Sequence, residues 1–367
     1  MTSLKPMKLR DLGKIVSGAT PRRDTPSNWG GDIPWITPKE LSSLDDPVVT
    51  ATAEMITQSG YDSCSASMLP KGSILFSSRA PIGHTAIVGI PMCTNQGFKS
   101  IVPNANVNSR YLYWCLVCHK QQIIDLGRSA TFKKINKATI ESVQLPIPVG
   151  KDEIPDADAQ MRIAAILDKA NGIRRKRAEA IGLTDEFLRS AFLHMFGDPV
   201  SNPKGWDECE LGNLLSFLTS GSRGWAKYYS KEGKLFFRIQ NVGHNKLILE
   251  DIARVDPPDS AEARRTQVKP GDVLFSITAD LGRTAVVPAS LGGAHINQHL
   301  ALLRSAKINP YFLSGYLASP AGQMQVIALN RNGVKAGLNF DDIRSLKILL
   351  PPRPTQDDYE VVYHKYS

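Results

Sequence analysis

The sequence predicts a mixed α/β (α+β) chain in which two similar domains are joined by one long central helix. Residues 156–196 have helical periodicity, and the segments on either side of them repeat the same motifs in the same order. Those segments combine short strand-like runs with few helices. A chain of 367 residues is long enough for two domains that each bury a core.

The central helix is predicted from apolar residues spaced three, four or seven apart, which places them on one stripe. Asp156 and Asp158 suit its N-terminus, while Gly197 and Pro199 end it. At 1.5 Å per residue the helix would be roughly 60 Å long, so we expect it to separate the two domains. The stripe consists of Ile163, Ile166, Ala170, Ile173, Ala180, Phe187, Ala191 and Met195.

The repeat is the most informative feature of the sequence. Residues 70–77 (PKGSILFS) resemble residues 269–276 (KPGDVLFS), and the Asn-Gln pair at 95–96 recurs at 297–298. The first copy should contain strands at 33–36, 73–77 and 85–90 and a helix at 110–127. Residues 21–32 and 222–233 have little in common. The two domains should therefore share a framework and carry different surface loops.

The bulk composition limits the classes of partner and compartment. The net charge is +9 and the pI is near 9.2, which favours nucleic acid or an anionic surface as partner. No apolar stretch approaches the roughly 20 residues that span a bilayer, and residues 1–10 lack a signal core. We expect a cytoplasmic protein whose five cysteines are reduced.

Motifs for catalysis and metal binding are weak. The chain has no GxxxxGK[ST] phosphate loop. Residues 256–259 (DPPD) resemble the DPPY box of amino-methyltransferases but lack its aromatic residue, so we interpret them as a turn. Cys115, Cys118 and His119 match a haem attachment pattern only formally, and His295 with His299 lacks the glutamate of a zinc helix. We predict no catalytic residue and no metal ligand.

Basic and amide side chains are the remaining candidates, because backbone phosphates bind cations and base edges bind forked or amide side chains. Six of them lie in or beside the divergent loops and are the candidates for base contacts: Arg22, Arg23, Arg223, Arg238, Gln240 and Asn241. The Asn-Gln pairs are shared by both copies, so we assign them to hydrogen bonds within the framework. For any single cation, a solvated surface charge is the alternative. The full predicted DNA-binding set is Arg22, Arg23, Arg79, Lys133, Lys134, Arg223, Lys227, Arg238, Gln240, Asn241, Arg283 and Lys335.

Together these residues resemble the specificity subunit of Type I restriction-modification systems. The resemblance rests on GDIPWIT at 31–37, LPKGSILFSSR at 69–79, TNQGF at 94–98 and AQMRIAAILDKA at 159–170, and on their duplication. It implies two target-recognition domains that each read half of a split site in double-stranded DNA. It also implies partners that act in phage defence: modification subunits that methylate adenine and a restriction subunit with motor and nuclease activity. The chain itself would be non-catalytic and without cofactor, whereas the partners would use S-adenosylmethionine, ATP and Mg.

The resemblance divides the chain into domain 1 at 1–152, a spacer helix at 153–200, domain 2 at 201–352 and a remnant of a distal helix at 353–367. In the family a second long helix packs antiparallel on the first, and here we expect it to be truncated. The stripe of the central helix would then be exposed and would bind a modification subunit or a second copy of the chain. The predicted partner-binding residues are Ile163, Ile166, Ala170, Ile173, Phe187 and Ala191.

Two other interpretations stay open at this point. The chain could be a truncated or silenced copy that binds DNA without recruiting the modification subunit, and co-purification distinguishes this case. It could also be a stand-alone nuclease, which we disfavour because no carboxylate cluster recurs between the halves. Cleavage of DNA by the isolated chain with a divalent metal would revive that class.

Overall fold

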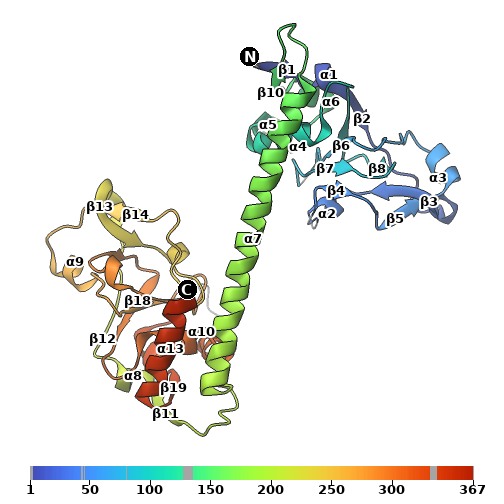
Figure 1. Cartoon of the computed structure of the whole chain (residues 1–367). Coiled ribbons are helices and arrows are strands. Elements are labelled where there is room, and N and C mark those ends of the chain that lie inside the picture. The colour runs from blue at the N-terminus through green and yellow to red at the C-terminus, as the bar shows by residue number, and fades with distance from the viewer. Residues whose placement is uncertain are drawn as a thin grey trace. The chain divides into compact units, whose positions relative to one another are not determined.

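The computed structural model describes residues 3–42, 44, 46–79, 81–126, 135–330 and 337–366. The chain divides into unit 1, Met1–Lys176, and unit 2, Arg177–Ser367. Each unit combines strands and helices around cores of its own. Helix α7, Ala157–Phe196, runs without a break from unit 1 into unit 2 (Figure 1). The predicted mixed α/β class and the long central helix are confirmed.

The described residues of unit 1 form three sheets. The largest has the order β2-β9-β6-β7-β4, the second has the order β5-β3-β8, and a third pairs the first and last strands of the unit. Their strands are β1 (Ser3–Lys8), β2 (Gly13–Ser17), β3 (Trp29–Ile36), β4 (Val48–Val49), β5 (Glu54–Ile56), β6 (Ile74–Phe76), β7 (Thr85–Val88), β8 (Cys93–Thr94), β9 (Lys99–Pro103) and β10 (Gln144–Val149). The helices are α1 (Leu9–Leu12), α2 (Pro38–Leu41), α3 (Gln58–Asp62), α4 (Ser109–Cys118), α5 (Lys120–Leu126) and α6 (Lys137–Ser142), with the 3-10 turn η1 (Pro26–Asn28).

Unit 2 repeats this arrangement with the orders β12-β18-β15-β16, β14-β13-β17 and β11-β19. Its strands are β11 (Asp207–Glu210), β12 (Phe217–Ser220), β13 (Tyr229–Phe237), β14 (Ala253–Val255), β15 (Val273–Ser276), β16 (Thr284–Val286), β17 (His295–Ile296), β18 (Leu300–Arg304) and β19 (Lys347–Leu350). The helices are α8 (Leu211–Leu214), α9 (Ala261–Arg265), α10 (Pro310–Ala318), α11 (Pro320–Leu329), α12 (Phe340–Arg344) and α13 (Arg353–Tyr366), with 3-10 turns η2 (Trp225–Tyr228), η3 (Ile239–Asn241) and η4 (Ala289–Leu291).

The repeat extends to strand register. Leu75 pairs with Ala86 between β6 and β7, and Leu274 pairs with Ala285 between β15 and β16. The divergent loops also follow the same course, because each forms a 3-10 turn and then a strand with an irregular register, β3 or β13. The two units therefore differ at these loops in side chains more than in backbone.

The ends of α7 follow the sequence signals. The Asp156 carboxylate accepts a hydrogen bond from the amide of Ala159 at 2.9 Å, as an N-cap does. At the other end, Gly197 has a φ of +80° and Lys204 donates to the carbonyl oxygen of Met195 at 2.7 Å. No described helix is both long and apolar enough to cross a bilayer.

Gln160 and Gln356 occupy equivalent places in the two units. The side-chain oxygen of Gln160 accepts from the amide of Asn108, the N-cap of α4, at 2.8 Å. Gln356 accepts from the amide of Asn309, the N-cap of α10, at 2.9 Å. Both glutamines are buried, so each hydrogen bond is shielded from water. The bond of Gln160 holds α7 against α4 in unit 1, and the bond of Gln356 holds α13 against α10 in unit 2. Helix α13 thus matches the first turns of α7.

Helix α13 buries one side of its surface, which the sequence did not indicate. We expected residues 353–367 to be a remnant of a distal helix, and in α13 the residues Gln356, Tyr359 and Tyr363 recur at intervals of three and four and are buried. The Tyr359 ring lies 5.3 Å from the ring of Phe192, and Tyr366 lies 4.6 Å from Phe187. The 14-residue helix therefore covers the C-terminal part of α7.

A glycine explains how unit 2 accepts two helices on α10. A Cβ atom at Gly315 would lie 3.0 Å from the Phe192 ring of α7. By the spacing from the N-cap asparagines, unit 1 has Trp114 at this place, and its indole donates to Asp168 of α7 at 2.8 Å. The predicted helix at 110–127 also differs from the structure, because it is divided at His119 into α4 and α5.

Candidate nucleic-acid interface

Three chain segments meet at one place in unit 1. A Cβ atom at Gly18 would lie 2.0 Å from the carbonyl oxygen of Asn95, so only glycine fits between the turn after β2 and the turn after β8. The Ser78 amide, just after β6, donates to the carbonyl oxygen of Gly97 at 2.7 Å. Residues 18–23, 77–79 and 95–98 form what we call the turn cluster of unit 1.

Unit 2 builds the same cluster from residues 221–227, 276–278 and 297–300. A Cβ atom at Gly221 would lie 2.1 Å from the carbonyl oxygen of Asn297. The Ile277 amide donates to the carbonyl oxygen of His299 at 3.0 Å. The backbone geometry of the two clusters is therefore alike, while most of their outward side chains differ.

The asparagines of the Asn-Gln pairs shape these turns. Asn95 Oδ1 accepts from the amide of Gly97 at 2.8 Å, and Asn297 Oδ1 accepts from the amide of His299 at 3.2 Å. This is the turn in which a short side chain caps the backbone two residues later. The framework role expected for the shared pairs fits the asparagines.

Three predicted cations of unit 1 belong to the turn cluster but differ in their surroundings. Arg22 and Arg79 are exposed and form no ion pair within the described part of the chain. Arg23 lies over the Trp29 ring, 4.0 Å from its centroid, and pairs with Glu54 at 2.8 Å. Because the charge of Arg23 is already paired, Arg23 stabilises the loop at residues 21–32, whereas Arg22 faces solvent. Lys133 and Lys134 lie outside the described residues.

In unit 2, Arg223 and Lys227 are exposed and flank Trp225, which is 6% exposed. The Trp225 ring is stacked 5.3 Å from Phe236 and lies 5.0 Å from His295. The buried indole of Trp225 thereby fixes the position of η2, and the exposed Arg223 and Lys227 lie on either side of Trp225 in the sequence. Lys335 lies outside the described residues.

His295, which packs beside Trp225, should make the stability of unit 2 depend on pH. Burial, reinforced by Lys234, lowers the pKa of His295 below its ordinary value of 6.5. The unfolded chain then binds more protons than the folded one, so the free energy of unfolding should fall as the pH drops below about 6.5. His295→Cys, which introduces the residue that unit 1 has at this register position (Cys93), should flatten the pH dependence of urea unfolding between pH 7.5 and 5.5. An equal dependence in both proteins would contradict this prediction.

Three predicted residues of unit 2 hold the loop after β13 together. Arg238 donates to the carbonyl oxygen of Asp251 at 2.6 Å, and Arg283 pairs with Asp280 and donates to Val242. Asn241 is fully buried. The expectation that Asn241 contacts DNA is corrected, because its side chain is enclosed and bonded to the backbone. Gln240 is exposed and stays a candidate.

Replacing Asn241 by alanine should destabilise this loop by about 1–3 kcal/mol, because a buried group would lose its partners. Asn241 accepts from the amide of Arg238 at 3.0 Å and donates to the carbonyl oxygen of Ile248 at 3.1 Å. Hydrogen exchange of the amides at 238–251 measures the effect. The variant Glu250→Ala, at an exposed side chain of the same loop, is the control and should leave exchange unchanged; equal exchange in the two variants would refute the role assigned to Asn241.

The predicted partner-binding stripe is exposed only in part. Ile166 is 68% exposed, Ile173 is 47% exposed and Ala170 faces solvent. Ile163 packs against the core of unit 1, and Phe187 contacts Tyr366, so both have partners within the chain. Ala191 is half-buried. The partner-binding residues stay a prediction, and Ile166, Ala170 and Ile173 are the members that are exposed.

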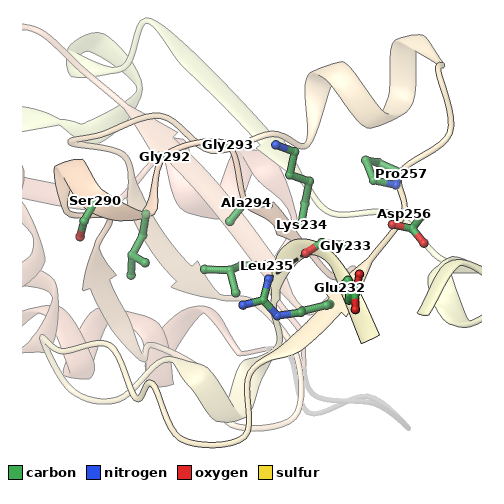
Figure 2. Close-up of a pocket in the computed structure, with 12 residues that line it drawn as sticks. Glu232, Gly233, Lys234, Leu235, Asp256, Pro257, Ser290, Gly292, Gly293 and Ala294 are labelled. Carbon is green, nitrogen blue, oxygen red and sulfur yellow. Dashed lines mark hydrogen bonds between the residues drawn. The ribbon is translucent and has the colours of Figure 1, made fainter. Parts of the chain in front are cut away.

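The other motifs have structural surroundings. Asp256 and Pro257 border a hollow of about 550 Å³ between the β13–β14 pair and η4 (Figure 2). Its charged lining is balanced, with Lys234 and Arg254 beside Glu232 and Asp256. The segment 256–259 is a loop that leads into α9. Among the described residues, no group of three or more His, Cys, Asp or Glu side chains could hold a metal ion.

Comparisons with known proteins agree with this architecture. Residues 1–181 match the model of the Type I restriction modification DNA specificity domain. The chain is 25% identical to the MjaIX specificity subunit of Methanocaldococcus jannaschii, over 95% of this chain and 83% of that protein. It is 28% identical to the EcoR124I/EcoR124II specificity subunit of Escherichia coli, over 47% of this chain and 42% of that protein.

A solved structure shares the fold. The S subunit of a Type I restriction-modification system from M. genitalium superposes with a TM-score of 0.57 at 13% identity, over all of this chain and 90% of that one. The structural match supports the two-domain fold only. The similarity to specificity subunits rests on the sequence relatives. Residues 1–181 thus match the family of Type I restriction modification DNA specificity domains, and the chain as a whole is similar to specificity subunits of Type I restriction-modification systems.

Proposed function

We propose that this chain is the DNA sequence-recognition subunit of a Type I restriction-modification complex. In this proposal each unit reads one short block of a bipartite, asymmetric site in duplex DNA. The observation that carries it is the turn cluster, which is built twice on one backbone plan and presents different side chains each time. A conserved frame with variable exposed residues is what two related readers of different sequences require.

The exposed cations support the phosphate contacts of this function. Arg22 and Arg79 in unit 1 and Arg223 and Lys227 in unit 2 lie in the turn clusters and are exposed. Cations positioned in this way bind backbone phosphates, which fix the register of a protein on duplex DNA. The amide and guanidinium groups beside them are suited to base edges in the major groove.

The chain would direct catalytic partners to the site rather than act on DNA itself. We propose that modification subunits supply adenine methylation with S-adenosylmethionine and that a restriction subunit supplies ATP- and Mg-dependent cleavage. The complex would act in the cytoplasm, where the DNA is. The exposed Ile166 and Ile173 of α7 are the part of the apolar stripe that we assign to a modification subunit.

Co-expression with a modification subunit from the same genome tests this function. The chain should co-purify with that subunit and permit methyl transfer from S-adenosylmethionine to duplex DNA. The variant Ile166→Glu/Ile173→Glu should lose the modification subunit while DNA binding by the chain persists. Met161→Glu is the matched control, because Met161 is 54% exposed and lies on another side of the helix.

The rival functions give different results in the same experiment. A silenced copy would bind DNA and never retain the modification subunit. A stand-alone nuclease would cleave DNA when only the purified chain and Mg²⁺ are present. Either result would replace the proposed function.

A further inference from the structure

We propose that Gln96 and Gln298 contact bases, and that their neighbours make one a hydrogen-bond donor and the other an acceptor. The inference rests on the proposed DNA-recognition function and deepens it. The sequence alone assigned both glutamines to the framework because both copies contain them. In the structure the framework bonds are made by the preceding asparagines. Of the two glutamines, Gln96 is exposed and Gln298 is partly exposed.

In unit 1 the carbonyl end of Gln96 is occupied. The hydroxyl of Thr20 donates a hydrogen bond to Gln96 Oε1. Gln96 is exposed, and its amide nitrogen has no partner within the described part of the chain. The side chain therefore presents the two N–H donors of its amide to solvent.

In unit 2 the nitrogen end of the same amide is occupied instead. Gln298 Nε2 lies 3.0 Å from His299 Nε2, and His299 Nδ1 contacts the hydroxyl of Thr278. An amide nitrogen only donates, so His299 Nε2 accepts and the ring carries its proton on Nδ1, which donates to Thr278. Gln298 Oε1, which has no partner among the described residues, is then the group available to a ligand.

Sequence differences around the two turns cause this reversal. Counting from the glycines that contact the asparagines, Thr20 of unit 1 corresponds to Arg223 of unit 2, so unit 2 lacks that hydroxyl. Gly97 corresponds to His299, so unit 1 lacks the imidazole. The shared glutamine is constant, and the variable neighbours decide which end of it is exposed.

The two ends of the amide fit different bases. In the major groove guanine presents the acceptors O6 and N7 and thymine presents O4, whereas adenine and cytosine present amino donors. Gln96 should therefore favour guanine or thymine at one position of its block. Gln298 should favour adenine or cytosine. In each glutamine the neighbour takes one of the two hydrogen-bonding positions at one end of the amide, which disfavours the two-bond pair with adenine.

The same substitution at the two equivalent positions tests the inference. A carboxylate only accepts hydrogen bonds, so Gln96→Glu reverses the group presented and Gln298→Glu conserves it. Bound sequences are selected from a random duplex pool with the full chain. Gln96→Glu should shift its position from guanine or thymine to adenine or cytosine, by about fivefold to tenfold. Gln298→Glu should keep the preference at its position, with lower affinity because of charge repulsion by phosphates.

A third variant tests the role of the neighbour. Thr20→Val removes the hydroxyl at nearly the same volume, so it should free the second lone pair of Gln96 Oε1 and raise the share of adenine selected at that position. The inference is overturned if Gln96→Glu lowers affinity without changing base preference, or if Gln298→Glu reverses its preference. If the unchanged chain selects no motif, the proposed function fails instead.

Discussion

Replacing Arg22, Arg79, Arg223 and Lys227 together by alanine should weaken binding to duplex DNA about 4,000-fold at 0.1 M salt. All four side chains are exposed in the turn clusters. Each phosphate contact releases about 0.9 of a counterion, which at this salt concentration is worth roughly a factor of eight in affinity. Four contacts multiply to roughly 4,000, and the slope of log affinity against log salt should decrease in magnitude by about 3.6.

The matched control removes four exposed lysines outside the clusters: Lys71, Lys151, Lys269 and Lys365. Lys71 and Lys269 precede β6 and β15, whereas the turn clusters follow these strands. The control changes the net charge equally, so it isolates position from total charge. Titrations of labelled duplex at several salt concentrations should give a slope within about one of the unchanged chain. Equal losses in the two variants would show that the clusters do not bind phosphates.

Replacing Phe192 by alanine should destabilise unit 2 by about 3–5 kcal/mol. Phe192 is 4% exposed and belongs to the cluster in which α7, α10 and α13 meet. Its ring lies 5.6 Å from Phe312 of α10 and 4.8 Å from Phe196. The loss combines the transfer free energy of the ring with a cavity that the surrounding helices fill only in part.

Hydrogen exchange of the α10 amides measures this loss, because those amides exchange only when unit 2 opens. Leu193→Ala on the same helix is the control, since Leu193 is 40% exposed and its truncation should cost less than about 1 kcal/mol. Protection of α4 in unit 1 should be unchanged in both variants. Similar exchange of α10 in the two variants would contradict the packing of α7 in unit 2.

The sequence predicted the parts of the fold that depend on periodicity and order. Helix α7 was predictable because its apolar spacing persists over many turns and its ends carry strong signals. The division at His119 was not, because the apolar pattern continues through it. The burial of one side of helix α13 was not predictable either, because it depends on the tertiary contacts of Tyr359 and Tyr363.

The candidate site was predictable as a set of residue types but not as a set of roles. An arginine in a variable loop suits DNA contact and loop closure equally well. Only the structure separates Arg22, which has no ion pair with any described residue, from Arg23, which is paired with Glu54 over Trp29. The distinction between Asn95 and Gln96 was missed for a related reason. Their shared occurrence indicated a common role, although one side chain turns inward and the next turns outward.

Selection of bound duplexes from a random pool, with the full chain at moderate salt, tests the central claim most directly. The account predicts two short fixed blocks of different sequence, separated by a gap of constant length and unspecified sequence. One uninterrupted motif, or no enrichment above the starting pool, would contradict the claim that two related units each read their own half of the site.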